Sequence, residues 1–280
     1  MKDKKKHDHG GSRNRAGGAR AQALQGRPAG EVLARATPEL TLLYGWHSVR
    51  AALENPHRKV LRLHAAAGAV AELEALAAER KIPLTTVTSQ AISATLPRDA
   101  VHQNVLLECR PLPDLDLADI ERKSGIVLVL DQITDPHNVG AIIRTAAAFN
   151  VDALVMTDRN APEMSGALAK AASGGLELVP IVRVVNLARA LRELAESGAR
   201  CIGLDSDAPE TLDDAASGLG AERNVALVLG AEGEGLRRLT RETCDVMARL
   251  DLPGQIISLN VSNACALALA AVYQALRTTV

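Results

Sequence analysis

Polar residues and glycines are concentrated in three stretches of the chain, each beside an apolar run. They read LDQITDPHNVGAIIRTA (130–146), LVLGAEGEGL (227–236) and DLPGQIISLNVSNA (251–264). The amides, hydroxyls, carboxylate and guanidinium in them are groups that bind nucleotides through hydrogen bonds. The apolar runs before the first two resemble strands buried on both faces of a sheet. Ligands of parallel sheets bind where the strands end, so these loops are the candidate site.

The first stretch contains one arginine beside the start of a predicted helix, residues 138–150. Asn138 is expected to cap this helix, and Ile142 begins its core-facing stripe. Arg144 points away from that stripe, and Gly140 leaves its side of the helix uncovered. Two interpretations stay open. Arg144 is either an ordinary exposed arginine or a guanidinium held over a phosphate near a helix N-terminus, since the guanidinium and the helix N-terminus each favour anions.

The second stretch predicts a strand, a glycine-rich turn and a helix that starts near Arg237. Its glycines follow G-x-x-G-x-G and not the G-x-G-x-x-G order of dinucleotide sites. Glycines let a backbone approach a ligand closely, although a tight turn alone would also need them. Glu232 within the turn is expected to cap backbone groups or to hydrogen-bond a ligand.

The third stretch turns at Pro253-Gly254, runs through a short extended segment, QIIS, and opens a helix. Ser258, Asn260 and Ser262 are capping residues, but they exceed what one cap requires and so predict a polar pocket. The segment 258–277 has no charge before Arg277. It is too polar at its start for a membrane span, which needs roughly 20 apolar residues. A buried or interface helix is expected instead.

Around these loops the chain predicts two α/β units joined by a linker. Residues 37–110 form the smaller unit, and the proline-containing linker covers 111–124. The smaller unit is predicted to contain helices at 45–55 and 69–81 and strands at 59–66, 84–88 and 104–109. From Gly125 the strands are predicted at 125–130, 152–157, 176–184, 200–205 and 224–230, with helices at 138–150, 166–173 and 186–198. This alternation is typical of a parallel sheet.

Composition excludes several classes of protein. The chain of 280 residues has only four aromatic residues, too few for RNA binding by stacking platforms. Its four scattered cysteines predict neither disulfides nor a metal site, and they fit a reducing cytoplasm. Residues 1–35 hold nine Lys/Arg against three Asp/Glu and have no apolar signal segment. We expect residues 1–36 to be a disordered basic tail that aids solubility or grips phosphates.

Taken together, the motifs N-x-G-x-x-x-R-T-A (138–146), L-G-A-E-G-E-G-L (229–236) and S-L-N-V-S (258–262) resemble those of the SPOUT methyltransferases. The chain is most similar to the TrmH branch and its RlmB-like members, which methylate the 2′-hydroxyl of a guanosine in 23S rRNA. The segment YGWHSVRAALE (44–54) resembles the start of their substrate-binding domain.

The resemblance implies an α/β trefoil-knot domain at 125–280 and a smaller N-terminal α/β RNA-binding domain. Knots are rare, so periodicity alone does not predict one. It also implies S-adenosylmethionine as cofactor, ribosomal RNA as substrate, and a homodimer formed through the last helix. No metal and no membrane association are expected, and the cytoplasm is the expected location.

By the same resemblance, particular residues receive roles. The expected catalytic set is Asn138, Arg144, Glu232, Ser258 and Asn260. The expected cofactor contacts are Leu204, Gly230, Leu250, Ile257 and Leu259. A guanidinium with a pKa above about 12 is a poor base, so Arg144 is expected to grip a phosphate and stabilise the developing alkoxide. Asn138 is expected to orient Arg144 or the ribose.

RNA placement is assigned to basic residues of the smaller unit. These are Arg50, Arg58, Lys59 and Arg62, each of which also fits an ordinary surface charge. Two other functions remain: methylation of a tRNA guanosine, and a non-catalytic rRNA-binding assembly factor on the same fold. A nucleotide-dependent oxidoreductase is disfavoured by the glycine order.

Overall fold

The computed structural model describes residues 33–113, 115–217, 219 and 224–278. Residues from Leu33 to the C-terminus form one compact unit. Most of the expected basic tail, residues 1–32, lies outside the described part. None of the described helices has the length and apolar character needed to cross a bilayer.

The smaller domain is a four-stranded sheet with three helices. Its strands are β1 (Thr41–Tyr44), β2 (Val60–Ala65), β3 (Leu84–Thr86) and β4 (Val105–Cys109), in the order β1-β4-β2-β3. Its helices are α1 (Trp46–Glu54), α2 (Ala67–Glu79) and α3 (Ser89–Thr95). Only β2 and β3 pair in parallel. The sequence analysis did not predict β1 and α3, whose four and seven residues are too short to show a clear period.

The larger domain is built on a seven-stranded sheet in which every neighbouring pair is parallel. Its strands are β5 (Ile126–Asp131), β6 (Ala153–Thr157), β7 (Ile181–Val184), β8 (Arg200–Leu204), β9 (Glu210–Thr211), β10 (Val225–Gly230) and β11 (Val246–Arg249). The order is β7-β6-β5-β10-β8-β11-β9. The apolar runs of β5 and β10 lie side by side near the centre, where layers of helices bury both faces.

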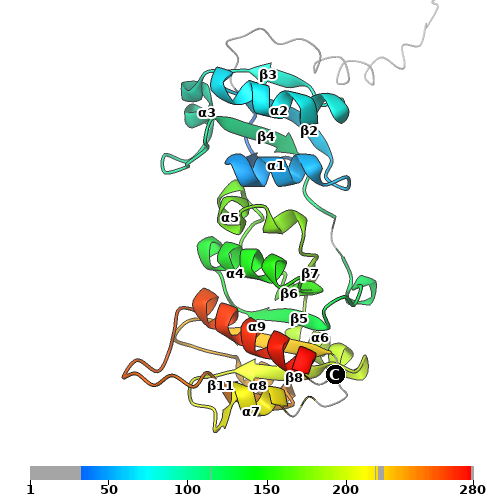
Figure 1. The fold of residues 1–280 in the computed structure, drawn as a ribbon, viewed down its shortest axis with the longest axis vertical. Helices are drawn as coiled ribbons and strands as arrows, with labels where there is room; N and C mark the ends of the chain where they lie inside the picture. The colour runs from blue at the N-terminus through cyan, green and yellow to red at the C-terminus, as the bar shows by residue number, and fades with distance from the viewer. Residues whose placement is uncertain (1–32, 114, 218, 220–223, 279–280) are drawn as a thin grey trace, which may run out of the picture. The chain divides into compact units, whose positions relative to one another are not determined.

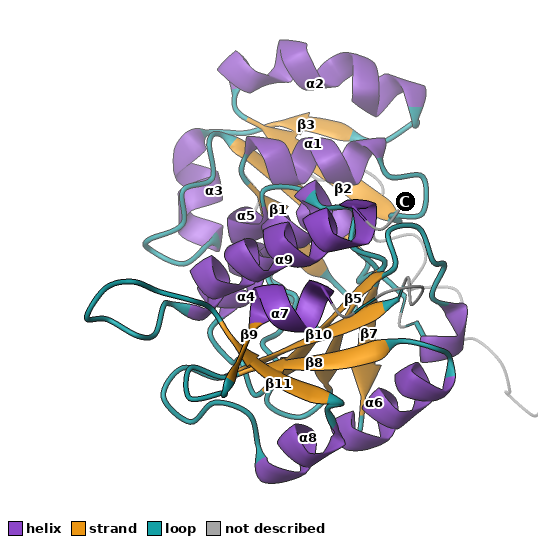
Figure 2. Ribbon diagram, turned by 60° about the horizontal axis from the view of Figure 1, so that its bottom comes forward, coloured by secondary structure: helices purple, strands orange, loops and turns teal. Residues whose placement is uncertain are grey.

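Helices cover both faces of this sheet (Figures 1 and 2). One face carries α4 (Pro136–Ala148), α7 (Leu212–Ser217) and α9 (Val261–Thr278), with α5 (Gly166–Ala172) packed on α4. The other carries α6 (Leu187–Glu196) and α8 (Arg238–Thr243). Two 3-10 helices complete the set, η1 (Leu117–Asp119) and η2 (Gly175–Glu177). Along β5, Leu128 faces the α4 side and Val129 the α6 side, as strand alternation requires.

The start of α4 differs from the sequence prediction. Asp135 caps the helix by accepting a hydrogen bond from the His137 backbone N–H, and Pro136 occupies the first turn. Asn138 is therefore inside the helix and is not its cap, so its side chain is free for other contacts. Helix packing also requires a glycine at position 140. A Cβ there would lie 2.5 Å from the Ala171 Cβ, so Gly140 lets α5 approach α4 closely.

Three other predictions were wrong or incomplete. The segment 176–184 is not one extended run, because η2 occupies its start and β7 begins at Ile181. QIIS (255–258) is exposed and forms no strand. The short elements β9, α7 and β11 were not predicted.

Candidate active site

A cavity of about 550 Å³ opens where neighbouring strands of the large sheet end. Strands β8, β10 and β11 finish at Leu204, Gly230 and Arg249, and the loops that follow them line the cavity. Its volume is in the range of small-molecule sites. The expected cofactor contacts all line it, as do three of the expected catalytic residues: Leu204, Gly230, Leu250, Ile257, Leu259, Glu232, Ser258 and Asn260.

A carboxylate joins three separate segments at the margin of this cavity. The Glu232 Oε1 accepts hydrogen bonds from the Asn260 Nδ2 at 2.6 Å, the Val261 backbone N–H at 3.1 Å and the Asn138 Nδ2 at 3.4 Å. The Asn260 Nδ2 also donates to the Asn138 Oδ1 at 3.0 Å. The first turn of α4, the glycine-rich loop and the start of α9 are thereby held together.

Asn260 also shapes the first turn of α9. Its Oδ1 accepts from the Ser262 backbone N–H at 3.0 Å and from the Ser262 Oγ at 2.6 Å. Capping therefore accounts for part of the polar surplus before this helix, as the sequence allowed. The Asn260 Nδ2 donates to Glu232 and Asn138, so one side chain caps the helix through its oxygen and lines the site through its nitrogen.

The glycine-rich loop folds tightly back on the end of β10. The Gly235 backbone N–H donates to the Ala231 carbonyl at 2.9 Å. A Cβ on Gly230 would lie 2.2 Å from the Gly235 carbonyl carbon, a distance that no side chain tolerates. Gly233 and Gly235 adopt φ values of 85° and 65°, where glycine carries no steric cost. The loop thus presents backbone directly to the cavity.

Arg144 lies apart from this cluster. It is exposed on α4, does not line the cavity, and has no hydrogen bond or ion pair among the described residues. It lies six positions after Asn138 in the helix, about 9 Å further along the axis. Asn138 contacts Glu232 and Asn260, and it does not contact Arg144. The guanidinium is therefore exposed and available to an incoming group.

Sequence reasoning missed several residues of the site. Asp205, Ser206 and Asp207 line the cavity after β8, and Arg241 forms an ion pair with Asp205. The strand end at Leu204 was the available indication, because the residues after it had to face the same edge.

Asp131, at the end of β5, is another residue that sequence reasoning missed. It is fully buried and accepts hydrogen bonds from the Arg237 backbone N–H at 3.0 Å and the Arg237 Nε at 2.7 Å. This pair fixes the exit of the glycine-rich loop. A single acidic residue directly after a buried apolar run was the indication in the sequence.

Of the four basic residues that were assigned to RNA placement, one assignment is wrong. Arg58 is 2% exposed and binds Glu177 of η2, so it cannot reach RNA. Arg50 and Lys59 are exposed, although Arg50 pairs with Glu54 on the same helix. Arg62 is half-buried. In the described part of the chain, no group of three or more His, Cys, Asp or Glu side chains is arranged to hold a metal.

Two family models match the chain, one for each domain. The SpoU rRNA Methylase family matches residues 125–270. A model described as RNA 2′-O ribose methyltransferase substrate binding matches residues 42–115.

Curated relatives cover most of the chain. A protein of Burkholderia sp named 23S rRNA (guanosine-2′-O-)-methyltransferase RlmB is 38% identical over 247 residues, which is 83% of this chain and 95% of the relative. The protein of the same name from Pseudomonas aeruginosa is 37% identical over 234 residues, 79% of this chain and 90% of its own.

Solved structures share the fold at lower identity. The SpoU methyltransferase AviRb of Streptomyces viridochromogenes, in complex with AdoMet, aligns with a TM-score of 0.69 at 22% identity, covering 86% of this chain and 90% of its own. An AdoMet-bound rRNA methyltransferase from Sinorhizobium meliloti aligns with a TM-score of 0.71 at 22% identity, covering 84% and 87%. The predicted fold class, a SPOUT domain with a smaller N-terminal α/β domain, is confirmed.

Proposed function

The chain belongs to the SpoU rRNA methylase family, and we propose that it methylates the ribose 2′-hydroxyl of a guanosine in 23S rRNA with S-adenosylmethionine. The observation that carries this proposal is the convergence of three loops, which follow β8, β10 and β11, on one cavity. The relatives share both domains with this chain, so the similarity includes the substrate-binding part.

The cavity fits the cofactor by its shape and by its donors and acceptors. Leu204 at the end of β8, with Leu250 and Leu259 from the loop between β11 and α9, offers apolar surface for a purine. Asp205 is already paired with Arg241, whereas Glu232 has only neutral hydrogen-bond donors as partners among the described residues, so its carboxylate favours a cationic sulfonium. Backbone N–H and carbonyl groups of the glycine-rich loop are accessible without side chains in the way. When bound, S-adenosylmethionine supplies an electrophilic methyl group.

The residues of this chain would orient and stabilise the attacking ribose. The 2′-hydroxyl would pass its proton to water, and the negative charge left on the oxygen would disappear as its bond to carbon forms. Arg144 stabilises that charge and holds the adjacent phosphate with a bidentate hydrogen-bonding geometry. Glu232, Asn260 and Asn138 would hold α4, the glycine-rich loop and the start of α9 at fixed positions, which favours a reaction between groups bound to them. Ser258, two residues before Asn260 in the loop that precedes α9, would hydrogen-bond the nucleotide.

The domain organisation that we propose follows the predicted boundaries. Residues 37–110 recognise RNA, 111–124 connect, and 125–280 hold the cofactor and the reacting groups. Leu33 packs with Leu42 and Ile92 of the smaller domain, so this domain includes residues before the predicted boundary at 37.

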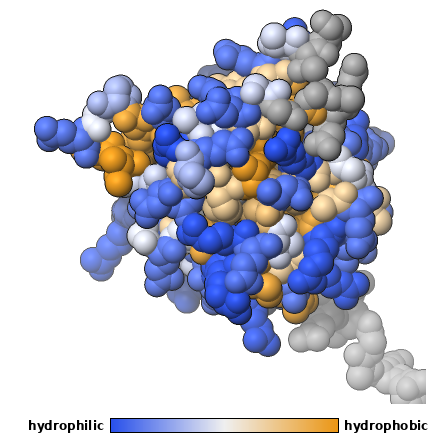
Figure 3. Space-filling view, turned by 90° about the horizontal axis from the view of Figure 1, so that it is seen from below, coloured by the Kyte–Doolittle hydropathy of each residue, from blue (hydrophilic) through white to orange (hydrophobic). Residues whose placement is uncertain are grey.

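We further propose that the protein is a homodimer of the cytoplasm. On α9 one side is buried, whereas Leu267 on the other is 49% exposed. Ile256 and Ile257, beside the cavity, are also exposed, and the view in Figure 3 shows apolar groups among hydrophilic ones. All four cysteines are free thiols, as a reducing compartment favours. Sedimentation of the purified protein tests the dimer.

The basic tail would add affinity that is independent of RNA sequence. Phosphate contacts release counterions, so affinity falls with salt in proportion to the contacts made. Deleting residues 1–32 should weaken RNA binding and flatten its salt dependence. An unchanged affinity and slope would exclude this role.

Transfer of a labelled methyl group tests the function directly. The protein is incubated with labelled S-adenosylmethionine and either 23S rRNA or total tRNA, and the products are digested to nucleosides. Label in 2′-O-methylguanosine from 23S rRNA supports the proposal. Label confined to tRNA favours the tRNA enzyme, and RNA binding without label favours an assembly factor.

A further inference from the structure

A buried ion pair and two closely packed glycines hold the RNA-binding domain against the catalytic domain at one 3-10 turn. The turn, η2 with Gly174 before it, lies between α1 of the smaller domain and α4, which carries Arg144. We propose that the buried pair Arg58–Glu177 is a positioning device, which fixes the RNA-binding domain relative to Arg144. This inference rests on the proposed function of the chain.

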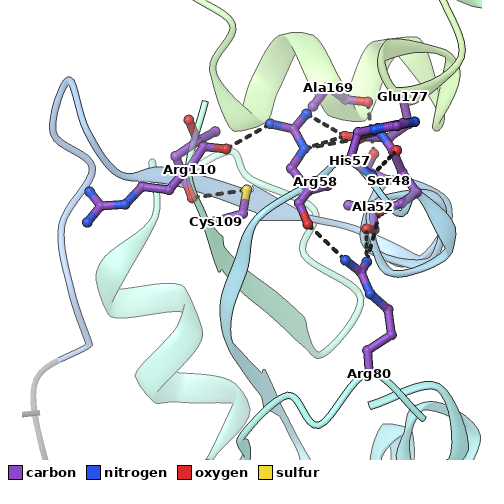
Figure 4. Close-up of polar contacts among 11 residues, drawn as sticks. Ser48, Ala52, His57, Arg58, Arg80, Cys109, Arg110, Ala169 and Glu177 are labelled. Carbon is purple, nitrogen blue, oxygen red and sulfur yellow. Dashed lines mark hydrogen bonds and ion pairs between the residues drawn. The ribbon is translucent and has the colours of Figure 1, made fainter. Parts of the chain in front are cut away.

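The ion pair crosses from one domain to the other and is fully enclosed (Figure 4). Both side chains are 2% exposed. The Arg58 Nη2 donates to the Glu177 Oε1 at 2.5 Å, and the Arg58 Nε lies 3.0 Å from Oε2. The Asn55 Nδ2 donates to the same Oε2 at 2.8 Å. A buried carboxylate with three nitrogen donors has its charge compensated, which a solvent-exposed pair does not require.

The small domain holds its half of the pair rigidly. The Arg58 Nη1 donates to the Arg110 carbonyl at 3.0 Å, at the end of β4. Arg80 donates to four carbonyls at the end of α1 and in the following turn, among them the Asn55 carbonyl at 3.0 Å and the Arg58 carbonyl at 2.9 Å. Figure 4 shows Arg80 beneath the turn that presents Arg58. The turn therefore cannot shift without losing several hydrogen bonds.

The catalytic domain holds its half through two glycines. A Cβ on Gly174 would lie 3.0 Å from the Ala51 Cβ of α1, and one on Gly175 would lie 3.2 Å from the Arg144 Cα of α4. Consecutive Cα atoms are about 3.8 Å apart, so α1 and the backbone of Arg144 contact adjoining residues of one turn. The position of Glu177 is thus linked to Arg144 by direct packing.

Other contacts support the same docking. The Ser48 Oγ of α1 donates to the Ala169 carbonyl of α5 at 2.8 Å, and both groups are buried. Apolar residues of the two domains, such as Leu53 and Leu168, belong to one buried cluster. The domains are therefore docked through a continuous core, and Arg58–Glu177 determines the register of that docking.

The variants Glu177→Gln and Arg58→Lys test the proposal. Each keeps the approximate size of the side chain but removes the charge or the planar fork. With a 23S rRNA transcript, kcat should fall by roughly tenfold to a hundredfold, because small displacements of reacting groups cost that much. Calorimetry with S-adenosylmethionine should give the wild-type affinity. The KM for the transcript should change little, since each domain keeps its own surface.

Hydrogen exchange supplies a readout that does not depend on activity. The amides of α1 and η2 should exchange faster in both variants than in the wild type. Glu108→Gln is the matched control, because Glu108 pairs with the buried His64 at 2.8 Å inside the smaller domain alone. It should leave kcat unchanged. Gly175→Ala, which keeps the ion pair but pushes η2 from α4, should lower kcat as Glu177→Gln does.

Three outcomes would overturn the proposal. One is an unchanged kcat in Glu177→Gln with faster exchange at α1 and η2. Another is cofactor affinity that falls in step with kcat, which indicates general damage to the catalytic domain. The third is equal loss of kcat in Glu108→Gln. If Glu177→Gln does not fold, Arg58→Lys and Gly175→Ala carry the same comparison. A wild type that does not methylate 23S rRNA would instead refute the proposed function, and the exchange result would still stand.

Discussion

At the scale of single residues, three polar side chains of the site bind one another, whereas one arginine has no partner among the described residues. Glu232, Asn138 and Asn260 satisfy each other, which leaves them to hold loops in place. Arg144 is exposed and unpaired in the described part of the chain. An exposed cation without a partner is available to bind an anionic substrate.

Replacing Arg144 with alanine should abolish most methylation while cofactor binding persists. Loss of one charge that stabilises the transition state costs on the order of 10²- to 10³-fold in rate. Labelled methyl transfer measures the rate, and calorimetry measures the affinity for S-adenosylmethionine. Arg192→Ala, an exposed arginine on α6, is the matched control. Affinity lost in proportion to the rate would contradict the role given to Arg144.

Replacing Glu232 with glutamine should slow the reaction by about tenfold. Glu232 accepts three hydrogen bonds, and because solvent weakens bonds to an exposed carboxylate, their combined loss should amount to about 1.4 kcal/mol. The start of α9 should loosen, which hydrogen exchange at Val261 detects. Glu234→Gln in the same loop is the control and should behave as the wild type. Equal effects of the two changes would point to charge alone and not to these contacts.

At the scale of elements, the glycine-rich loop depends on close contact between its two ends. Gly230 and Gly235 pack backbone against backbone, and no larger residue fits at Gly230. The same loop lines the cavity on one side and is held by the Arg237–Asp131 pair at its exit. Its shape is therefore determined by β5 and β10 together.

The variant Gly230→Ala should weaken cofactor binding. Overpacking of this kind costs about 1–3 kcal/mol, which corresponds to roughly a five- to hundredfold weaker affinity. Calorimetry measures it. The control is Gly254→Ala in the neighbouring loop, where the nearest atom to the new Cβ, the Ile256 backbone nitrogen, is 3.9 Å away. Wild-type affinity in Gly230→Ala would show that the loop can shift without consequence for the cofactor.

At the scale of the whole molecule, burial determines how the protein responds to alkali. Burial raises the pKa of each of the four cysteine thiols to about 12, from 9.0. Below pH 9 a thiol is protonated in both the folded and the unfolded state and contributes no pH dependence. Between pH 9 and 12 only the unfolded state loses the proton, so stability falls as pH rises.

Urea unfolding should reveal this loss, and one variant should reduce it. Each thiol contributes about 1.4 kcal/mol per pH unit within that window. Cys265→Ala should therefore lose less stability than the wild type between pH 9 and about pH 10, although it starts from a lower value. An equal slope in both proteins would mean that the thiol is not protected from ionisation by the fold.

The sequence alone predicted five of the seven strands described in the large sheet, β5, β6, β7, β8 and β10, and the order of the loops that follow them. Runs such as those at 126–131 and 225–230 must be apolar throughout, because helices cover both faces, and such runs are recognisable without a structure. Glycines and polar residues directly after them indicated the cavity. The short elements β9, α7 and β11 carry too few residues for a period to be detected.

Only the tertiary structure decided which charges are exposed and which polar groups meet. Asn260 and Asn138 bond across 122 residues of chain, a contact that no local pattern specifies. Arg58 looked like a surface cation, yet it is buried against Glu177, because the surface that covers it comes from the other domain. Local sequence records what a segment requires of its surroundings, whereas docking of distant segments determines which surroundings it receives.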